Sequence, residues 1–153
     1  MEQGGKKATR TGKRLEAFIE NLLIDCNYTY IKKKDFKKTT FLDQIIYTKQ
    51  LEVCESIYGS AMKSDFVLYH PEKWPQCLII ESKWQQIGGS VDEKFPYLVA
   101  NINERYPSPA MIVIDGGGFK KGAVDWLANQ RGENLLEVLT MQQFQKWVNE
   151  GNI

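Results

Sequence analysis

The sequence predicts a single α/β domain with a central mixed β-sheet flanked by helices. Apolar residues recur at helical spacing between Arg14 and Asp25, whereas short continuous apolar runs at 66–69, 78–80 and 110–114 have the length of buried strands. Segments with helical spacing alternate with these runs in the second half of the chain. The 153 residues, 42% of them hydrophobic, are enough for one core and leave little room for a second domain.

The first helix is predicted from Arg14 to Asp25. Its apolar residues recur at i, i+3, i+4, i+7 and i+8, which places them on one face; they are Leu15, Phe18, Ile19, Leu22 and Leu23. Residues 1–12 are polar, glycine-rich and basic, and we expect a flexible basic N-terminal tail there. Residues 13–153 are expected to form the domain.

Three segments after the first helix have strand-like composition, with β-branched and aromatic residues at 28–31, 44–47 and 50–59. Further along, Ser90 followed by Glu93 predicts a capping box, and apolar residues from Phe95 to Ile102 predict a helix with a kink at Pro96.

The last part of the chain predicts two more strand and helix units. The strand at 110–114 is ended by Asp115 and three glycines, a helix is expected around 123–129, a strand at 135–139, and a final helix from Thr140. The stretch from Gly116 to Lys121 matches neither a P-loop nor a dinucleotide-binding motif, so no nucleotide cofactor is expected.

The strongest functional signal is a pair of acids with a lysine. Asp65 opens one apolar strand, and Glu81 and Lys83 follow the next strand. Residues two apart on a strand share a face, so Glu81, Lys83 and Gln85 are expected to point to one side as a catalytic group with Asp65. An exposed Glu–Lys ion pair is the simpler alternative, but a strand that is apolar until the acid appears favours a site.

These residue types suit metal-assisted hydrolysis of a phosphodiester. Oxygen ligands from Asp65, Glu81 and the main-chain carbonyl of Ser82 suit Mg²⁺, for which Mn²⁺ is expected to substitute. The metal would lower the pKa of a bound water, while Lys83 orients or deprotonates that water and contacts the phosphate.

At these residues the chain resembles the PD-(D/E)XK, or restriction-endonuclease-like, nuclease superfamily. The matching stretches are Ser64–Leu68 and Leu78–Gln85, with Ser64 where the family often has proline. The resemblance implies a restriction-endonuclease-like fold, Mg²⁺-dependent cleavage of DNA and catalytic roles for Asp65, Glu81 and Lys83. It also implies that Glu16, on the first helix, reaches the metal site, and that Lys94 faces the phosphate; a solvated side chain is the alternative for both.

The formal net charge of +1 does not by itself indicate a nucleic-acid partner, but the basic residues are clustered. Lys32, Lys33 and Lys34 form one cluster, and Lys120 and Lys121 follow the glycine loop, where a DNA backbone contact competes with a plain surface turn. A small single-domain nuclease that cuts duplex DNA is expected to act as a homodimer, because two-fold symmetry matches antiparallel strands.

The three widely spaced cysteines and the single histidine predict neither a zinc site nor a disulfide scaffold, and a reducing cytoplasm is expected. No apolar stretch is long enough to span a membrane, and the N-terminus lacks a signal-peptide core.

The leading hypothesis is therefore a Mg²⁺-dependent DNA endonuclease. One alternative is a structure-specific nuclease that resembles a Holliday-junction resolvase, which preference for branched DNA would reveal. The other is a DNA-binding protein that has the same fold and no catalytic activity, against which the complete set of Asp65, Glu81 and Lys83 argues.

Overall fold

The computed structural model describes residues 3–40 and 43–153, and describes side chains from residue 12 onward within these ranges. A six-stranded sheet in the order β1-β2-β3-β4-β5-β6 forms its centre. The strands are β1 (Thr29–Tyr30), β2 (Ile46–Glu55), β3 (Ala61–His70), β4 (Trp74–Trp84), β5 (Ala110–Asp115) and β6 (Leu135–Leu139). The helices are α1 (Gln3–Asp25), α2 (Lys33–Thr39), the 3₁₀ turn η2 (Asp92–Lys94), α3 (Phe95–Glu104), α4 (Lys121–Ala128) and α5 (Met141–Asn149).

The sheet is mixed, as the sequence predicted. β2, β3 and β4 pair antiparallel, while β1 pairs parallel with β2, and β4, β5 and β6 pair parallel with one another. Helix α3 connects β4 to β5, and α4 connects β5 to β6. Parallel neighbours require such crossover connections, and this arrangement brings the carboxyl ends of β4 and β5 to one edge of the sheet.

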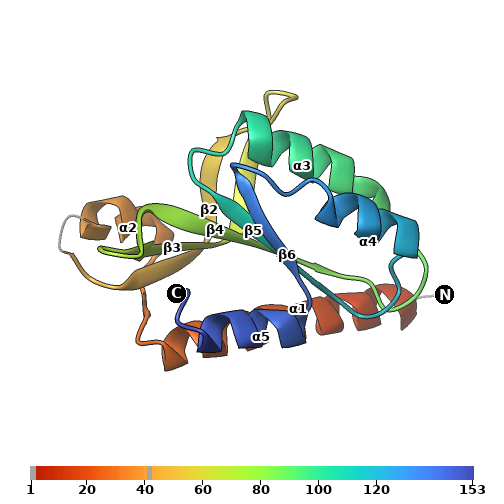
Figure 1. The fold of residues 1–153 in the computed structure, drawn as a ribbon, viewed down its shortest axis with the longest axis horizontal. Coiled ribbons are helices and arrows are strands. Elements are labelled where there is room, and N and C mark those ends of the chain that lie inside the picture. Colours follow the sequence, from red (N-terminus) through yellow and green to blue (C-terminus); the bar gives the residue numbers. More distant parts are fainter. Residues whose placement is uncertain (1–2, 41–42) are drawn as a thin grey trace.

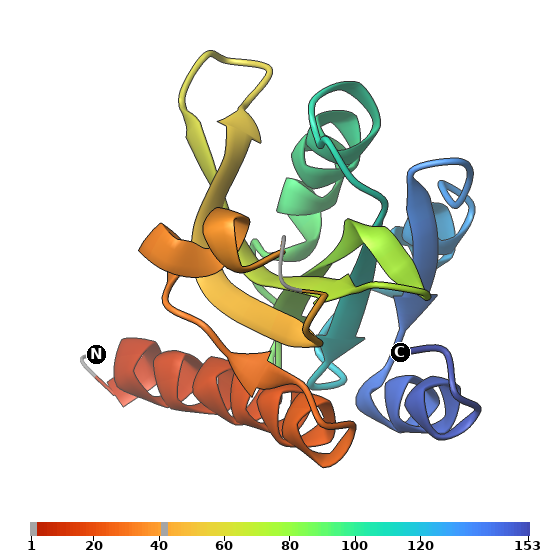
Figure 2. The ribbon, with the colours of Figure 1, turned by 90° about the vertical axis from the view of Figure 1, so that its left-hand side faces the viewer.

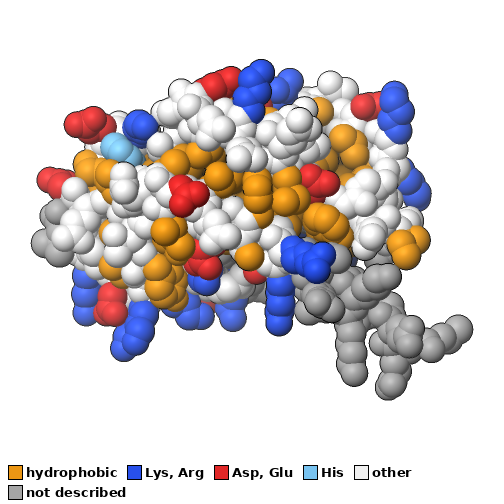
Figure 3. Space-filling view, turned by 90° about the horizontal axis from the view of Figure 1, so that it is seen from below, with side chains coloured by type: hydrophobic (Ala, Val, Ile, Leu, Met, Phe, Trp, Pro, Cys, Tyr) orange, Lys and Arg blue, Asp and Glu red, His pale blue; other side chains and the backbone are white. Residues whose placement is uncertain are grey.

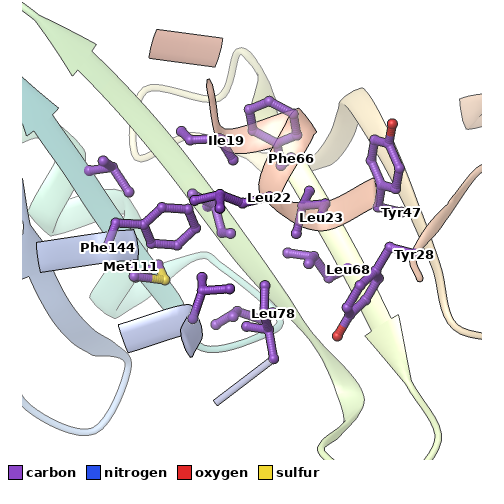
Figure 4. Packing of buried hydrophobic residues seen from close by; sticks show 14 of the residues in the cluster. Ile19, Leu22, Leu23, Tyr28, Tyr47, Phe66, Leu68, Leu78, Met111 and Phe144 are labelled. Carbon is purple, nitrogen blue, oxygen red and sulfur yellow. The ribbon is translucent and has the colours of Figure 1, made fainter. Parts of the chain in front are cut away.

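Helices cover both faces of the sheet, and a separate core lies on each face. Figure 1 shows α1 and α5 on one side of the sheet and α3 and α4 on the other. The α1 side buries the helical stripe predicted from the sequence, including Leu15, Ile19 and Leu23, against Phe66 and Leu78 (Figure 4). The opposite core is built on the α3 side from residues that include Ile79, Phe95, Ile102 and Ile112. Because successive side chains of a strand point to opposite faces of the sheet, each central strand contributes residues to both cores.

Helix α1 begins at Gln3, earlier than the predicted start at Arg14. The segment 3–12, expected to be a tail, forms the first turns of this helix, since its lysines, arginine and alanine are compatible with helix and its glycines only weaken it. Residues 1 and 2 lie outside the described residues. The mobility of the segment and the domain boundary at residue 13 stay predictions.

Two strands predicted separately, at 44–47 and 50–59, form the single strand β2. The chain continues through Gln50 with a positive φ of 55°. Helix α2 was not predicted, because five of its seven residues are lysine or aspartate and only Phe36 is buried. Figure 2 shows that the turn between β2 and β3 projects away from the sheet.

The capping box predicted at Ser90 and Glu93 is wrong. The residue before η2 is Val91, which makes no side-chain cap, and α3 starts only at Phe95. Pro96 then lies in the first turn, where its missing N–H costs nothing and proline gives no reason for a kink. A capping box does begin α5, where Thr140 and Gln143 exchange side-chain to backbone hydrogen bonds.

None of the helices within the described residues is both long enough and apolar enough to cross a membrane. Cys26, Cys54 and Cys77 are free thiols, as expected for a chain without a disulfide scaffold.

Candidate active site

The candidate site lies where β3 and β4 separate. The two strands pair as far as Phe66 and Ile80, and Asp65 is the next residue of β3. Its Oδ2 accepts hydrogen bonds from the backbone N–H of Ser82 at 2.8 Å and from the Ser82 hydroxyl at 3.1 Å. From Glu81 to Trp84, β4 continues against β5. The structure thus places the Asp65 carboxylate directly beside the Glu81–Lys83 segment.

Glu81 is buried and close to Asp65. Its side chain is only 3% exposed, and its Oε1 accepts a hydrogen bond from the Tyr106 hydroxyl at 2.7 Å. Burial and then the Asp65 charge raise the pKa of Glu81 to about 8, against the opposing effects of Lys83 and the Tyr106 hydrogen bond. A carboxyl with so high a pKa, next to a second acid and a lysine, is typical of a functional site.

Glu16 of α1 borders the same site. Burial raises its pKa, the Asp65 charge raises it further, and the charges of Lys49 and Lys83 act in the opposite direction. One helical turn later, Glu20 is engaged differently: it pairs with Lys49 at 3.0 Å and accepts a hydrogen bond from the Tyr47 hydroxyl at 2.7 Å. Glu16, and not Glu20, is therefore the acid that α1 leaves facing Asp65 and Lys83.

The donor set fits a divalent cation held by two protein carboxylates. The described residues contain no group of three or more His, Cys, Asp or Glu side chains arranged to hold an ion. Mg²⁺, however, is commonly bound by one or two carboxylates together with water and substrate phosphate. Burial and then the charge of Asp65 disfavour the ionised form of Glu81, and a cation held by these two carboxylates would favour ionisation of both.

Gln85 lies outside this group of side chains. It follows the last residue of β4, and its side chain is buried. Its Nε2 donates to the carbonyl of Gly118 at 2.9 Å, and its Oε1 accepts from the backbone N–H of Val91 at 2.8 Å. Both ends of the amide are used to hold two loops together, so the amide of Gln85 is engaged by backbone groups of these loops and not by Asp65, Glu81 or Lys83.

The predicted DNA-contacting lysines fall into two places. Lys94 and Lys120 lie on adjoining segments, since the backbone N–H of Lys120 donates to Asp92 in η2 at 3.3 Å. Lys121 opens α4 and forms an exposed ion pair with Asp125 at 3.1 Å. Lys32, Lys33 and Lys34 are exposed at the start of α2, which packs against β2.

Figure 3 shows the face formed by α1 and α5, with most of its visible basic side chains near the edge.

Two residues at the site were not predicted from the sequence. Tyr106 contacts Glu81 from the end of α3, and Gln50 of β2 donates from its Nε2 to Asp65 Oδ1 at 3.2 Å. They lie 25 and 15 residues from their partners along the chain, and neither belongs to a motif. No sequence signal marks either residue, because only the pairing of strands and the path after α3 create these contacts.

Comparison with known proteins agrees with this geometry. Residues 7–152 match the family model described as the PD-(D/E)XK nuclease superfamily domain. Comparisons with curated proteins and with solved structures gave no match. The acids on β3 and β4, the lysine two residues later and the six-stranded mixed sheet stand within the matched segment. This chain belongs to the PD-(D/E)XK nuclease superfamily.

Proposed function

We propose that this nuclease is a Mg²⁺-dependent endonuclease acting on duplex DNA. The observation that carries the proposal is the convergence of Asp65 and Glu81, one of them buried with a pKa raised to about 8, beside Lys83. Two acids that cannot easily ionise together are suited to a cation, and the adjacent ammonium group is suited to a phosphate or an attacking water.

Each residue of the group has a specific role in the proposal. Asp65 and Glu81 would hold the metal, with the carbonyl of Ser82 as a further ligand and the carboxylate of Glu16 acting through a bound water. The bound metal supplies a water of lowered pKa and neutralises charge on the phosphate. Lys83 donates from its Nζ to the phosphate oxygen or to the attacking water. Gln85 supports the site by holding the loops beyond β4.

We assign the DNA backbone contacts to exposed lysines. Lys94 follows β4, Lys120 and Lys121 follow β5, and in the proposal all three supply phosphate contacts beyond the carboxyl ends of these strands. Lys32, Lys33 and Lys34 form a second basic surface at α2. A homodimer supplies two such sites for the two strands of a duplex.

A cleavage assay with matched variants tests the proposal. Supercoiled plasmid, linear duplex and a four-way junction are incubated with the wild type, Lys83→Ala and Lys146→Ala, in Mg²⁺, Mn²⁺ or EDTA. Lys146 is an exposed lysine on α5, outside the group of site residues, and controls for the loss of one positive charge. We expect metal-dependent cutting that Lys146→Ala retains and Lys83→Ala reduces by about a hundredfold or more.

The outcomes separate the alternatives. Equal cutting by Lys83→Ala and wild type contradicts the catalytic role of Lys83. Preference for the four-way junction over linear duplex indicates a resolvase. DNA binding without cleavage of any substrate, in either metal, indicates the inactive DNA-binding protein.

A further inference from the structure

Gln50 has an unusual backbone conformation within a strand. Its φ is 55°, in the left-handed region, although it is not glycine and lies inside β2. Residues other than glycine rarely adopt this backbone conformation. Where they do, the surrounding structure holds them in it, often at a functional site.

The strand register places Gln50 opposite Asp65. On one side of it Lys49 pairs with Phe66, and on the other Leu51 pairs with Ser64. Gln50 and Asp65 are the residues between these two pairs. The strained residue of β2 therefore faces the acid of β3 that borders the candidate site.

At Gln50 the side chains of β2 change the face of the sheet to which they point. Ile46 packs in the core on the α3 side and Tyr47 in the core on the α1 side, as alternation requires. Leu51, five residues after Ile46, packs on the α3 side again, where a regular strand would place it on the α1 side. A left-handed residue at position 50 accounts for this change of face, since one residue of each strand lies between the flanking pairs and no extra residue is inserted there.

The side chain of Gln50 completes the hydrogen bonds around Asp65. Its Nε2 donates to Asp65 Oδ1 at 3.2 Å, while the Ser82 N–H and hydroxyl donate to Oδ2. Donors on both oxygens fix the rotation of the carboxylate. Carboxylate ligands in metal sites are typically held by such partners, and removing one partner weakens metal binding.

We propose that Gln50 is a positioning residue that orients Asp65 for metal binding, and that its strained backbone is retained for this purpose. The proposal rests on the proposed function, since it assumes that Asp65 is a metal ligand. Gln50 acts through Asp65 and touches neither metal nor substrate.

The test uses Gln50→Gly, which removes the amide and the strain together. Mn²⁺ affinity is measured by isothermal titration calorimetry and the melting temperature without metal by thermal denaturation. We expect the Mn²⁺ Kd of Gln50→Gly to rise about tenfold, while its melting temperature is no lower than that of the wild type. Gln50→Asn tolerates the left-handed conformation but has a shorter side chain, and is expected to bind Mn²⁺ more weakly as well.

Asn27→Gly is the matched control. Asn27 also has a positive φ, of 68°, but it follows the end of α1 and is not among the donors to Asp65. This variant should keep the wild-type Kd and also keep or raise the melting temperature.

Wild-type Mn²⁺ affinity in both Gln50→Gly and Gln50→Asn overturns the inference, while a wild type that binds Mn²⁺ and cuts DNA leaves the proposed function intact. A clear drop in the melting temperature of Gln50→Gly also overturns it, because the side chain would then serve stability. A wild type that neither binds Mn²⁺ nor cuts DNA overturns the proposed function and this inference together.

Discussion

Where β3 and β4 separate, the two acids Asp65 and Glu81 lie close enough for their negative charges to repel each other. Glu81 is nearly fully buried beside Asp65, and its pKa of about 8 means that the metal-free protein keeps it protonated at neutral pH. The proton on Glu81 and a bound cation are alternative ways of relieving the same repulsion. Both the stability of the protein and its metal affinity should therefore depend on pH.

The stability of the metal-free protein should fall as pH rises from about 5 to about 8. The folded pKa of Glu81 lies above its unfolded value, so the folded state binds more protons in this range, and raising the pH favours unfolding. In Glu81→Gln the side chain stays neutral at every pH. The free energy of unfolding of this variant should be about 1–3 kcal/mol higher than that of the wild type at pH 8 and nearly the same at pH 5. Urea denaturation in EDTA at both pH values measures this; an equal pH dependence in both proteins would contradict it.

Tyr106→Phe should lower the stability of the folded protein without changing the shape of the site around Glu81. The variant removes the hydroxyl that donates to Glu81 Oε1 at 2.7 Å, a buried hydrogen bond. We expect the free energy of unfolding to decrease by about 1–2 kcal/mol, more at pH 8 than at pH 5, because the donor favours the charged carboxylate. Chemical denaturation of metal-free protein provides the measurement, and an unchanged stability at both pH values would show that the hydroxyl contributes nothing.

At the scale of elements, two loops are locked together at the carboxyl ends of β4 and β5. Gln85 bonds to both of them, and the backbone N–H of Gly118 donates to the carbonyl of Gln85 at 2.7 Å. The Phe95 and Phe119 rings, which flank these loops, lie 5.4 Å apart. The packing of the loops requires glycine at position 118, since a Cβ there would lie 2.5 Å from the carbonyl carbon of Gln86.

Gly118→Ala should therefore separate the two loops. We expect it to lower the free energy of unfolding by about 2–4 kcal/mol, because the clash is with backbone that cannot rotate away. Gly122→Ala is the control: an added Cβ there meets nothing within 4 Å in α4, and alanine favours the helix. Denaturant unfolding of both variants compares them, and equal stability of the two would mean that the packing between the loops is dispensable.

At the scale of the whole molecule, a net charge of +1 conceals an uneven distribution. Basic side chains concentrate in and around α2 and at Lys120 and Lys121 before and at the start of α4, while the acids Asp65 and Glu81 lie where β3 and β4 separate. Phosphate contacts depend on local charge, and every contact releases counterions from the DNA.

The salt dependence of DNA binding should report these phosphate contacts. In a Lys120→Ala, Lys121→Ala double variant, the slope of log K against log salt should be smaller by about 0.9 for each of the two lysines that binds a phosphate in the wild type. Fluorescence anisotropy with a labelled duplex in EDTA measures binding without cleavage. The charge control is Lys146→Ala, which should keep the wild-type slope; the same slope in the double variant would exclude these two lysines from the DNA interface.

The sequence by itself determined the fold class, most of the elements, and Asp65, Glu81 and Lys83 as a group, because each depends on local periodicity or on a short motif. Strand 135–139 and the apolar stripe of α1 were predicted residue by residue. Helix α2 and the continuity of β2 were missed, since a polar helix lacks periodicity and Gln50 bends the strand without a glycine.

Only the tertiary structure decided which side chains complete the site. Gln85 was expected to act in catalysis with Glu81 and Lys83, but the sequence could not show that the backbone groups of Val91 and Gly118 engage both ends of its amide. Gln50 reaches Asp65 because β2 pairs with β3, and Tyr106 reaches Glu81 because the chain after α3 passes beside β4. Periodicity specifies which face a residue occupies within an element; the approach of separate elements is set by packing of the whole chain, and the partners of Asp65 and Glu81 depend on that packing.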